Sequence, residues 1–203
     1  MELVTAPTVI SIDPGGTTGW SVMVVHPEAL VHDDVSILRN IEHWTHGQVR
    51  AIPDKDKPSA GELAEEERKC IKILMRDALG RWPGAAVVIE DFILRKMSKN
   101  RELLSPVRLT SGLEWAIEMS GMEQTLHRQT PTQAKGTATD ERLKRWGLYK
   151  RAGAQQHARD GDRHSIVFLR RAKESGALRG KAWPHLYLPS GDLRPGVMVG
   201  ATE

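Results

Sequence analysis

Acidic residues lie at the ends of two apolar runs, where a carboxylate could bind a metal or take part in catalysis. The run V-I-S-I over residues 9–12 ends on Asp13, and the run A-A-V-V-I over residues 85–89 ends on Glu90 and Asp91. Short apolar runs rich in β-branched residues are typical of buried strands. A lone buried carboxylate is costly, and in practice it pairs, binds a metal or shifts its pKa. Asp13 alone fits a turn cap equally well, but the repetition at Glu90 favours a site.

The second run, Ala85 to Phe92, also predicts which acid belongs to that site. Side chains alternate along a strand, so Glu90 and Asp91 face opposite ways and only one of them can share a site with Asp13. The next residues, Leu94 to Arg101, are rich in Lys and Arg. We expect them to form a basic loop along which a substrate backbone could pass.

A third acid-bearing segment runs from His157 to Lys173. At about 100° per residue, His157, Asp160 and His164 fall on one helix face if the helix begins early enough, whereas Asp162 lies about 200° from Asp160. The alternative is an acidic first turn that complements the helix dipole, with the histidines on the surface.

Acids from two strand ends and one helix, converging on one sheet edge, would form an oxygen-ligand site suited to Mg²⁺ or Mn²⁺. Two such ions about 3.5–4 Å apart can activate a water and stabilise the leaving oxygen in phosphodiester hydrolysis. The residue types therefore point to metal-assisted phosphoryl chemistry.

The elements that must position these residues alternate between strands and helices. Pro14-Gly15-Gly16 forces a turn after the first strand. Ser59, with Glu62 three residues later, is typical of a helix N-terminus closed by a capping box. The predicted order is β-β-β-α-β-α-β-α-α, with these elements: strands to Asp13, over Thr17–Val25, His43–Ile52, Ala85–Phe92 and Glu123–Gln129; helices from Ser59 to Leu79, Ser105 to Ser120, Asp140 to Trp146 and His157 to Lys173.

Length and composition limit the classes of protein to which the chain can belong. The 203 residues carry 29 Lys and Arg against 26 Asp and Glu, so the net charge of +3 permits a polyanionic partner without requiring one. A basic excess between Lys135 and Arg171 fits either a phosphate-binding face or a solvated helix surface. Cys70 is the single cysteine, which excludes a disulfide framework and a cysteine zinc site. No membrane span or signal peptide is apparent, and we expect a cytoplasmic protein.

We expect one domain over residues 1–176 and an irregular C-terminal tail over residues 177–203, rich in Gly and Pro. Apolar residues of the tail, Trp183 to Leu188, could pack back on the body. Trp20, Trp44 and Trp115 are interpreted as core or structural positions, although an exposed tryptophan could stack on an unpaired base.

The chain resembles the ribonuclease H-like superfamily and, within it, the RuvC-like Holliday junction resolvases, over roughly residues 7 to 175. Four motifs carry the resemblance: I-D-P-G at Ile12–Gly15 followed by T-G-W at Thr18–Trp20, V-V-I-E at Val87–Glu90, P-T-Q-A-K at Pro131–Lys135, and the acidic head of the final helix. The resemblance implies an α/β fold with a ribonuclease H-like mixed five-stranded sheet flanked by helices.

The resemblance also implies roles for individual residues. Asp13 and Glu90 would bind metal, and Lys135 would contact phosphate near the scissile bond. The last family motif is a pair of acids, or a histidine and an acid, three residues apart. His157 and Asp160 have that spacing, but we expect Asp160 and then His164 to complete the site, with Asp162 least favoured by geometry.

Family members are homodimers that cut two strands of a four-way junction. The chain is therefore predicted to be a homodimeric, Mg²⁺- or Mn²⁺-dependent endonuclease with two ions per site, acting on branched DNA in recombination or repair and leaving 5′-phosphate and 3′-hydroxyl ends. A small resolvase with an additional tail would suit a bacteriophage.

Three other functions compete with this prediction. A nuclease of the same fold that cuts flaps, RNA–DNA hybrids or RNA would share the metal site. A nucleic-acid-binding relative without catalysis would not need Asp13, Glu90 and Asp160. A sugar kinase or actin-like ATPase would need two such domains and a second glycine-rich phosphate loop, for which 203 residues are too few.

Overall fold

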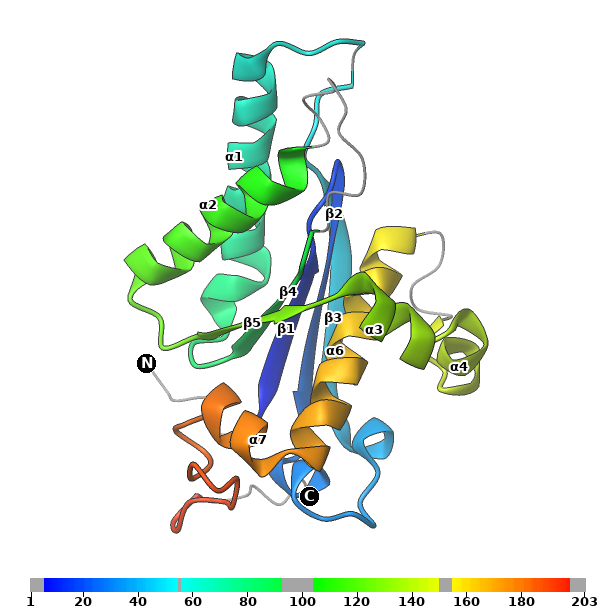
Figure 1. Ribbon diagram of the computed structural model, residues 1–203, viewed down its shortest axis with the longest axis vertical. Helices are drawn as coiled ribbons and strands as arrows, with labels where there is room; N and C mark the ends of the chain where they lie inside the picture. Colours follow the sequence, from blue (N-terminus) through cyan, green and yellow to red (C-terminus); the bar gives the residue numbers. More distant parts are fainter. Residues whose placement is uncertain (1–5, 55, 93–103, 150–154, 198–203) are drawn as a thin grey trace.

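A mixed five-stranded sheet forms the centre of the molecule (Figure 1). The computed structural model describes residues 6–54, 56–92, 104–149 and 155–197, so the basic segment Leu94 to Arg101 lies outside the described residues. The strands are β1 (Thr8–Asp13), β2 (Thr17–Val25), β3 (Ile41–Arg50), β4 (Ala86–Glu90) and β5 (Thr125–Gln129), in the order β3-β2-β1-β4-β5. β1, β2 and β3 pair antiparallel, whereas β4 and β5 continue the sheet parallel to β1. The predicted mixed α/β sheet is confirmed.

Helices cover both faces of this sheet (Figure 1). α1 (Ala60–Asp77) and α2 (Ser105–Ser120) pack on one face, and α6 (Gln156–Glu174) packs on the other. The shorter helices are α3 (Pro131–Thr137), α4 (Asp140–Arg145) and α7 (Gly176–Ala182), with 3₁₀ turns at Pro27–Leu30, Ile37–Asn40 and Leu79–Arg81. The capping box of Ser59 and Glu62 opens α1, as predicted.

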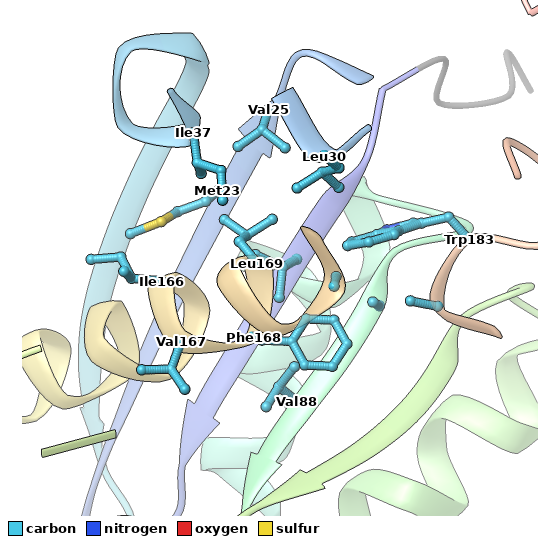
Figure 2. Packing of buried hydrophobic residues seen from close by; sticks show 14 of the residues in the cluster. Met23, Val25, Leu30, Ile37, Val88, Ile166, Val167, Phe168, Leu169 and Trp183 are labelled. Atoms are coloured by element: carbon cyan, nitrogen blue, oxygen red, sulfur yellow. The ribbon is translucent and has the colours of Figure 1, made fainter. Parts of the chain in front are cut away.

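The alternation of side chains along each strand divides the core into two layers. On β1, Ile10 and Ile12 point to α1 and α2, whereas Val9 points to α6. The layer beneath α6 joins Val88 of β4 to Phe168 and neighbouring apolar residues of the helix (Figure 2). Odd-numbered residues of β1 and even-numbered residues of β4 therefore face α6, and this parity governs the site.

The chain beyond residue 176 differs from the irregular tail that the Gly and Pro content predicts. It begins with α7, and the following Trp183 and Tyr187 are fully buried in the layer beneath α6. The Trp183 indole donates a hydrogen bond to the carbonyl oxygen of Thr8, at 2.8 Å. The buried Arg179 guanidinium donates to the carbonyl oxygens of Gly191 and Leu30. These contacts make the segment up to residue 197 part of the body.

The three tryptophans expected in structural positions divide between two environments. Trp20 and Trp44 are partly buried and pack against the two core layers. Trp115 is 65% exposed on α2, so the expectation that it is a core residue is wrong. Its neighbours on α2 leave one side of the helix open, because the apolar residues that face α1 lie on the opposite side.

No helix within the described residues combines the length and the apolar character needed to cross a membrane.

Candidate metal centre

Asp13 ends β1 in the middle of the sheet, between β2 and β4. It shares the α6-facing side of β1 with Ser11, whose hydroxyl accepts a hydrogen bond from Ser165 of α6 at 2.9 Å. Beyond Asp13 the chain turns at Pro14-Gly15-Gly16, where the Thr18 hydroxyl donates to the carbonyl oxygen of Gly15. The Asp13 side chain is 16% exposed at this strand end.

α6 approaches β2 closely enough to bring its first turns beside Asp13. A Cβ atom on Gly19 would lie 1.9 Å from the carbonyl oxygen of His157, and a Cβ atom on Gly161 would lie 2.9 Å from the backbone of Trp20. Two glycines therefore allow the helix backbone to contact the strand backbone directly. The helix also begins at Gln156, early enough to include His157.

Asp162 anchors the same turn of α6 to the sheet. Its carboxylate accepts hydrogen bonds from the hydroxyl of Ser21 at 2.8 Å, the indole of Trp44 at 2.7 Å and Nδ1 of His46 at 2.9 Å. The three partners belong to β2 and β3, and the side chain is 1% exposed. Asp162 therefore faces away from Asp13 and has the contacts of a structural residue, as its angle on the helix predicts.

Asp13, His157 and Asp160 form a group that could hold a cation. Their ligand atoms, one from each residue, all lie within 4.8 Å of one another. Nδ1 of His157 is 3.9 Å from Oδ2 of Asp13, which is too long for a hydrogen bond. A gap of this size between donor atoms leaves room for an ion bound to all three.

Glu90 ends β4 next to this group and faces the same side of the sheet. Its Oε2 accepts a hydrogen bond from Nε2 of His164 at 2.5 Å. The adjacent Asp91 faces the other side, where one of its oxygens lies 3.7 Å from Arg128. The structure thus separates Glu90 from Asp91 as strand alternation predicts, and only Glu90 approaches Asp13.

The pKa of Asp13 reflects its burial first and the neighbouring negative charges second. Burial raises the pKa of Asp13 above its ordinary value, nearby His157 lowers it, and the charges of Glu90 and Asp160 raise it further. Asp13 in turn raises the pKa of His157, and Lys135 opposes that rise. A divalent cation would neutralise the charges that disfavour the Asp13 carboxylate.

The residues predicted for the site are placed as follows. Asp13 and Asp160 come together, and Glu90 lies beside them. Lys135, exposed in the last turn of α3, is near enough to influence the pKa of His157. His164, which the sequence analysis expects to complete the site after Asp160, contacts Glu90 and is not in the group around Asp13. The histidine of that group is His157.

Arg163 was not singled out in the sequence, although it follows Asp160 by three residues. Its guanidinium pairs with the carboxylates of Asp160 and Asp140, and its Nε donates to the carbonyl oxygen of Ala138 at 2.9 Å. The i, i+3 spacing from Asp160 on a predicted helix is a signal for this contact.

Solved structures of similar architecture include two RuvC chains. The Thermus thermophilus RuvC structure is 17% identical, with a TM-score of 0.54 over 87% of this chain and 98% of that one. T. thermophilus RuvC in complex with a Holliday junction substrate is 19% identical, with a TM-score of 0.52 over 83% of this chain and 96% of that one. No protein-family model and no curated protein sequence matches the chain. At this identity the comparison establishes a RuvC-like fold.

Proposed function

We propose that the chain is a metal-dependent endonuclease that cuts branched DNA, with four-way junctions as its substrate. The observation that carries the proposal is the meeting of Asp13, His157 and Asp160 beside Glu90 at the end of parallel strands. Burial raises the pKa of Asp13, the charges of Glu90 and Asp160 add to the rise, and a bound divalent cation would favour the ionised carboxylate against both effects.

The side chains present fit Mg²⁺ or Mn²⁺. Asp13, Glu90 and Asp160 offer carboxylate oxygens, which these hard cations prefer. A single histidine nitrogen beside these carboxylates is compatible with Mn²⁺. We assign Asp13, Glu90, Asp160 and His157 to hold two ions. The bound ions would supply Lewis-acid activation of water and of the leaving oxygen.

The protein's own residues orient the substrate. Lys135 provides a positive charge beside the carboxylates, where it can contact the phosphate next to the scissile bond. His157 is 42% exposed, so the open side of the site lies toward it, whereas Asp160 is buried beneath. A phosphodiester would enter past His157 and Lys135 and meet the acids behind them.

The choice of a four-way junction is supported by the Holliday junction that T. thermophilus RuvC binds in its complex. Flaps, RNA–DNA hybrids or RNA would use the same acids, and a binding-only protein would not need them. Symmetric cutting of a junction requires two sites, so the proposal includes a homodimer, for which the exposed apolar side of α2 is the interface.

The test is cleavage of a labelled synthetic four-way junction beside duplex, flap and RNA–DNA hybrid, with and without Mg²⁺ or Mn²⁺. We expect paired symmetric nicks in the junction that depend on the metal. Glu90→Gln should lower the cleavage rate at least about 100-fold, because losing a ligand exceeds the 10–100-fold cost of losing an outer partner.

Asp91→Asn is the matched control for Glu90→Gln. It neutralises the adjacent carboxylate of the same strand end, but on the face away from Asp13. Its exposed ion pair with Arg128 contributes little to stability, and cleavage should stay within twofold of the wild type. Equal losses of cleavage in both variants would contradict the assignment of the site. Cutting of flap or hybrid alone would contradict the four-way junction as the substrate.

A further inference from the structure

Two consecutive buried residues of α6 each contact one of the candidate acids. Arg163 and His164 follow Asp160 by three and four residues, which places them on the same side of the helix as Asp160. Arg163 pairs with Asp160 itself, and His164 reaches across to Glu90 of β4. Both side chains are at least nine-tenths buried by residue.

Arg163 fixes the orientation of the Asp160 carboxylate. Its Nη1 pairs with Oδ1 of Asp160, its Nη2 with the Asp140 carboxylate at the start of α4, and its Nε with the carbonyl oxygen of Ala138. A planar guanidinium held on three sides leaves the carboxylate little rotational freedom. Because Oδ1 already accepts from Arg163, this arrangement favours Oδ2 as the oxygen of Asp160 that binds a cation.

His164 does the same for Glu90. Its Nε2 donates to Oε2 of Glu90 at 2.5 Å, the side chain is 1% exposed, and its Nδ1 has no partner among the described residues. Within the part of the chain that the structure describes, the imidazole therefore makes a single hydrogen bond, and that bond goes to a candidate metal ligand. Outer partners of this kind orient metal-binding carboxylates in many proteins.

We infer that Arg163 and His164 are positioning residues of the metal centre, and that His164 acts through Glu90 without touching the ion. The inference rests on the proposed function and deepens it. It also links the centre to the corner between α3 and α4, since Arg163 joins Asp160 to Asp140 and Ala138.

The sign of one effect separates positioning from simple electrostatics. A positive guanidinium close to a bound cation repels it, so charge alone predicts that Arg163→Met tightens metal binding. Positioning predicts the opposite, a loss of 10–100-fold in affinity. Arg163→Lys retains the charge but not the fork that grips two carboxylates, so it should also bind the metal more weakly than the wild type.

The experiment measures the Kd for Mn²⁺ of the full chain by titration calorimetry, together with the unfolding midpoint of each metal-free variant. We expect Arg163→Met and His164→Leu to weaken binding by 10–100-fold. We expect His164→Gln to restore most of the affinity, because its amide can donate from a place near Nε2. Arg128→Met is the matched control, since Arg128 pairs with Glu114 and Asp91 on the opposite face.

A wild-type or tighter Kd in Arg163→Met overturns the inference, as does equal weakening by His164→Gln and His164→Leu. If Arg163→Met does not fold, the two His164 variants decide. Wild-type binding of Mn²⁺ with unchanged variants would leave the proposed function standing. Absence of Mn²⁺ binding by the wild type would overturn the proposed function, and this inference with it.

Discussion

The carboxylate of Asp13 is an unfavourable charge in the metal-free protein. Burial is the main reason that its pKa is raised, and the negative charges of Glu90 and Asp160 add to the rise. A carboxyl group with a raised folded-state pKa contributes stability below its ordinary pKa of about 3.9 and loses that contribution as the pH rises through the folded-state value. At neutral pH the ionised Asp13 therefore opposes folding.

Asp13→Asn should accordingly raise the unfolding midpoint of the metal-free chain while it abolishes cleavage. The difference from the wild type should be small near pH 4 and should grow as the pH rises, because only the wild type gains the buried charge. Thermal unfolding in the presence of a chelator, from pH 4 to neutral pH, measures this difference in unfolding midpoint. With saturating Mn²⁺ the order should reverse, since the ion stabilises the form that binds it. A variant less stable than the wild type at every pH without metal would contradict the prediction.

Single residues also show how far the sequence can predict the site. Asp13 and Glu90 are recognisable because each ends an apolar run that implies burial, and Asp160 because it shares a predicted helix face with His157 and His164. The choice between His157 and His164 is not recognisable in this way, since both lie on the face of Asp160. It depends on the distance between α6 and each strand end, which the backbone contacts at Gly19 and Gly161 determine.

At the scale of elements, the docking of α6 on β2 positions the centre. The helix contributes His157 and Asp160, and the strand contributes the glycine that lets them approach Asp13. The anchoring carboxylate Asp162 fixes the rotation of the helix against β2 and β3. The distance between helix and strand is therefore as important to the candidate site as the proposed ligands themselves.

Gly19→Ala should move α6 away from β2, because its Cβ would meet the carbonyl oxygen of His157 at 1.9 Å. Backbone atoms must shift to relieve that contact, so we expect a loss of about 1–3 kcal/mol in stability and a fall of about 100-fold in cleavage from misplacement of the acids. Denaturant unfolding and junction cleavage measure the two effects.

Gly136→Ala is the control for Gly19→Ala. A Cβ atom at Gly136 in α3 would have no neighbour within 4 Å, so this variant should be as stable as the wild type or slightly more stable. If Gly19→Ala keeps wild-type cleavage and stability, α6 does not depend on this close approach.

The main strands and the longer helices could be predicted, because apolar periodicity, the capping box at Ser59 and the glycine after α2 are local signals. α3 and α7 were not recognised as helices. Neither seven-residue segment shows an apolar period, and α7 contains two glycines. Tertiary contacts, including those of Arg179 and Trp183, hold the segment that starts with α7.

At the scale of the whole molecule, the resemblance to ribonuclease H-like proteins predicts a mixed five-stranded sheet, which is confirmed, whereas the sequence did not predict which surfaces are exposed. Trp115 is an example. α2 carries apolar residues both on the face that packs within the chain and on the exposed face, so the apolar pattern does not indicate which face is buried. Sequence alone cannot distinguish a core tryptophan from one that meets another molecule.

The open side of α2 is the candidate interface of the proposed homodimer. Among the described residues, the exposed large apolar side chains lie on α2, at its N-cap or on the neighbouring edge strand β5: Leu104, Val107, Trp115, Met119 and Leu126. Trp115 and Met119, one helical turn apart, are 65% and 66% exposed. Exposed apolar side chains gathered on one side of a helix are typical of an interaction site, and an isologous contact would place the two copies of α2 against each other.

Trp115→Glu should convert the dimer into monomers. The substitution removes an apolar contact and puts a carboxylate from each copy into the interface, where an unpaired charge costs several kcal/mol; a cost of about 3 kcal/mol corresponds to a weakening of roughly 100-fold. Gln48→Glu adds the same charge on β3, the opposite edge of the sheet, and should remain dimeric. Light scattering coupled to size exclusion gives the mass of each variant, and a monomeric wild type at micromolar concentration would overturn the proposed homodimer without bearing on the proposed metal centre.

If the dimer matters for cutting, Trp115→Glu should still nick one strand of a junction but lose the paired, symmetric cut, because a single copy brings only one set of Asp13, Glu90 and Asp160.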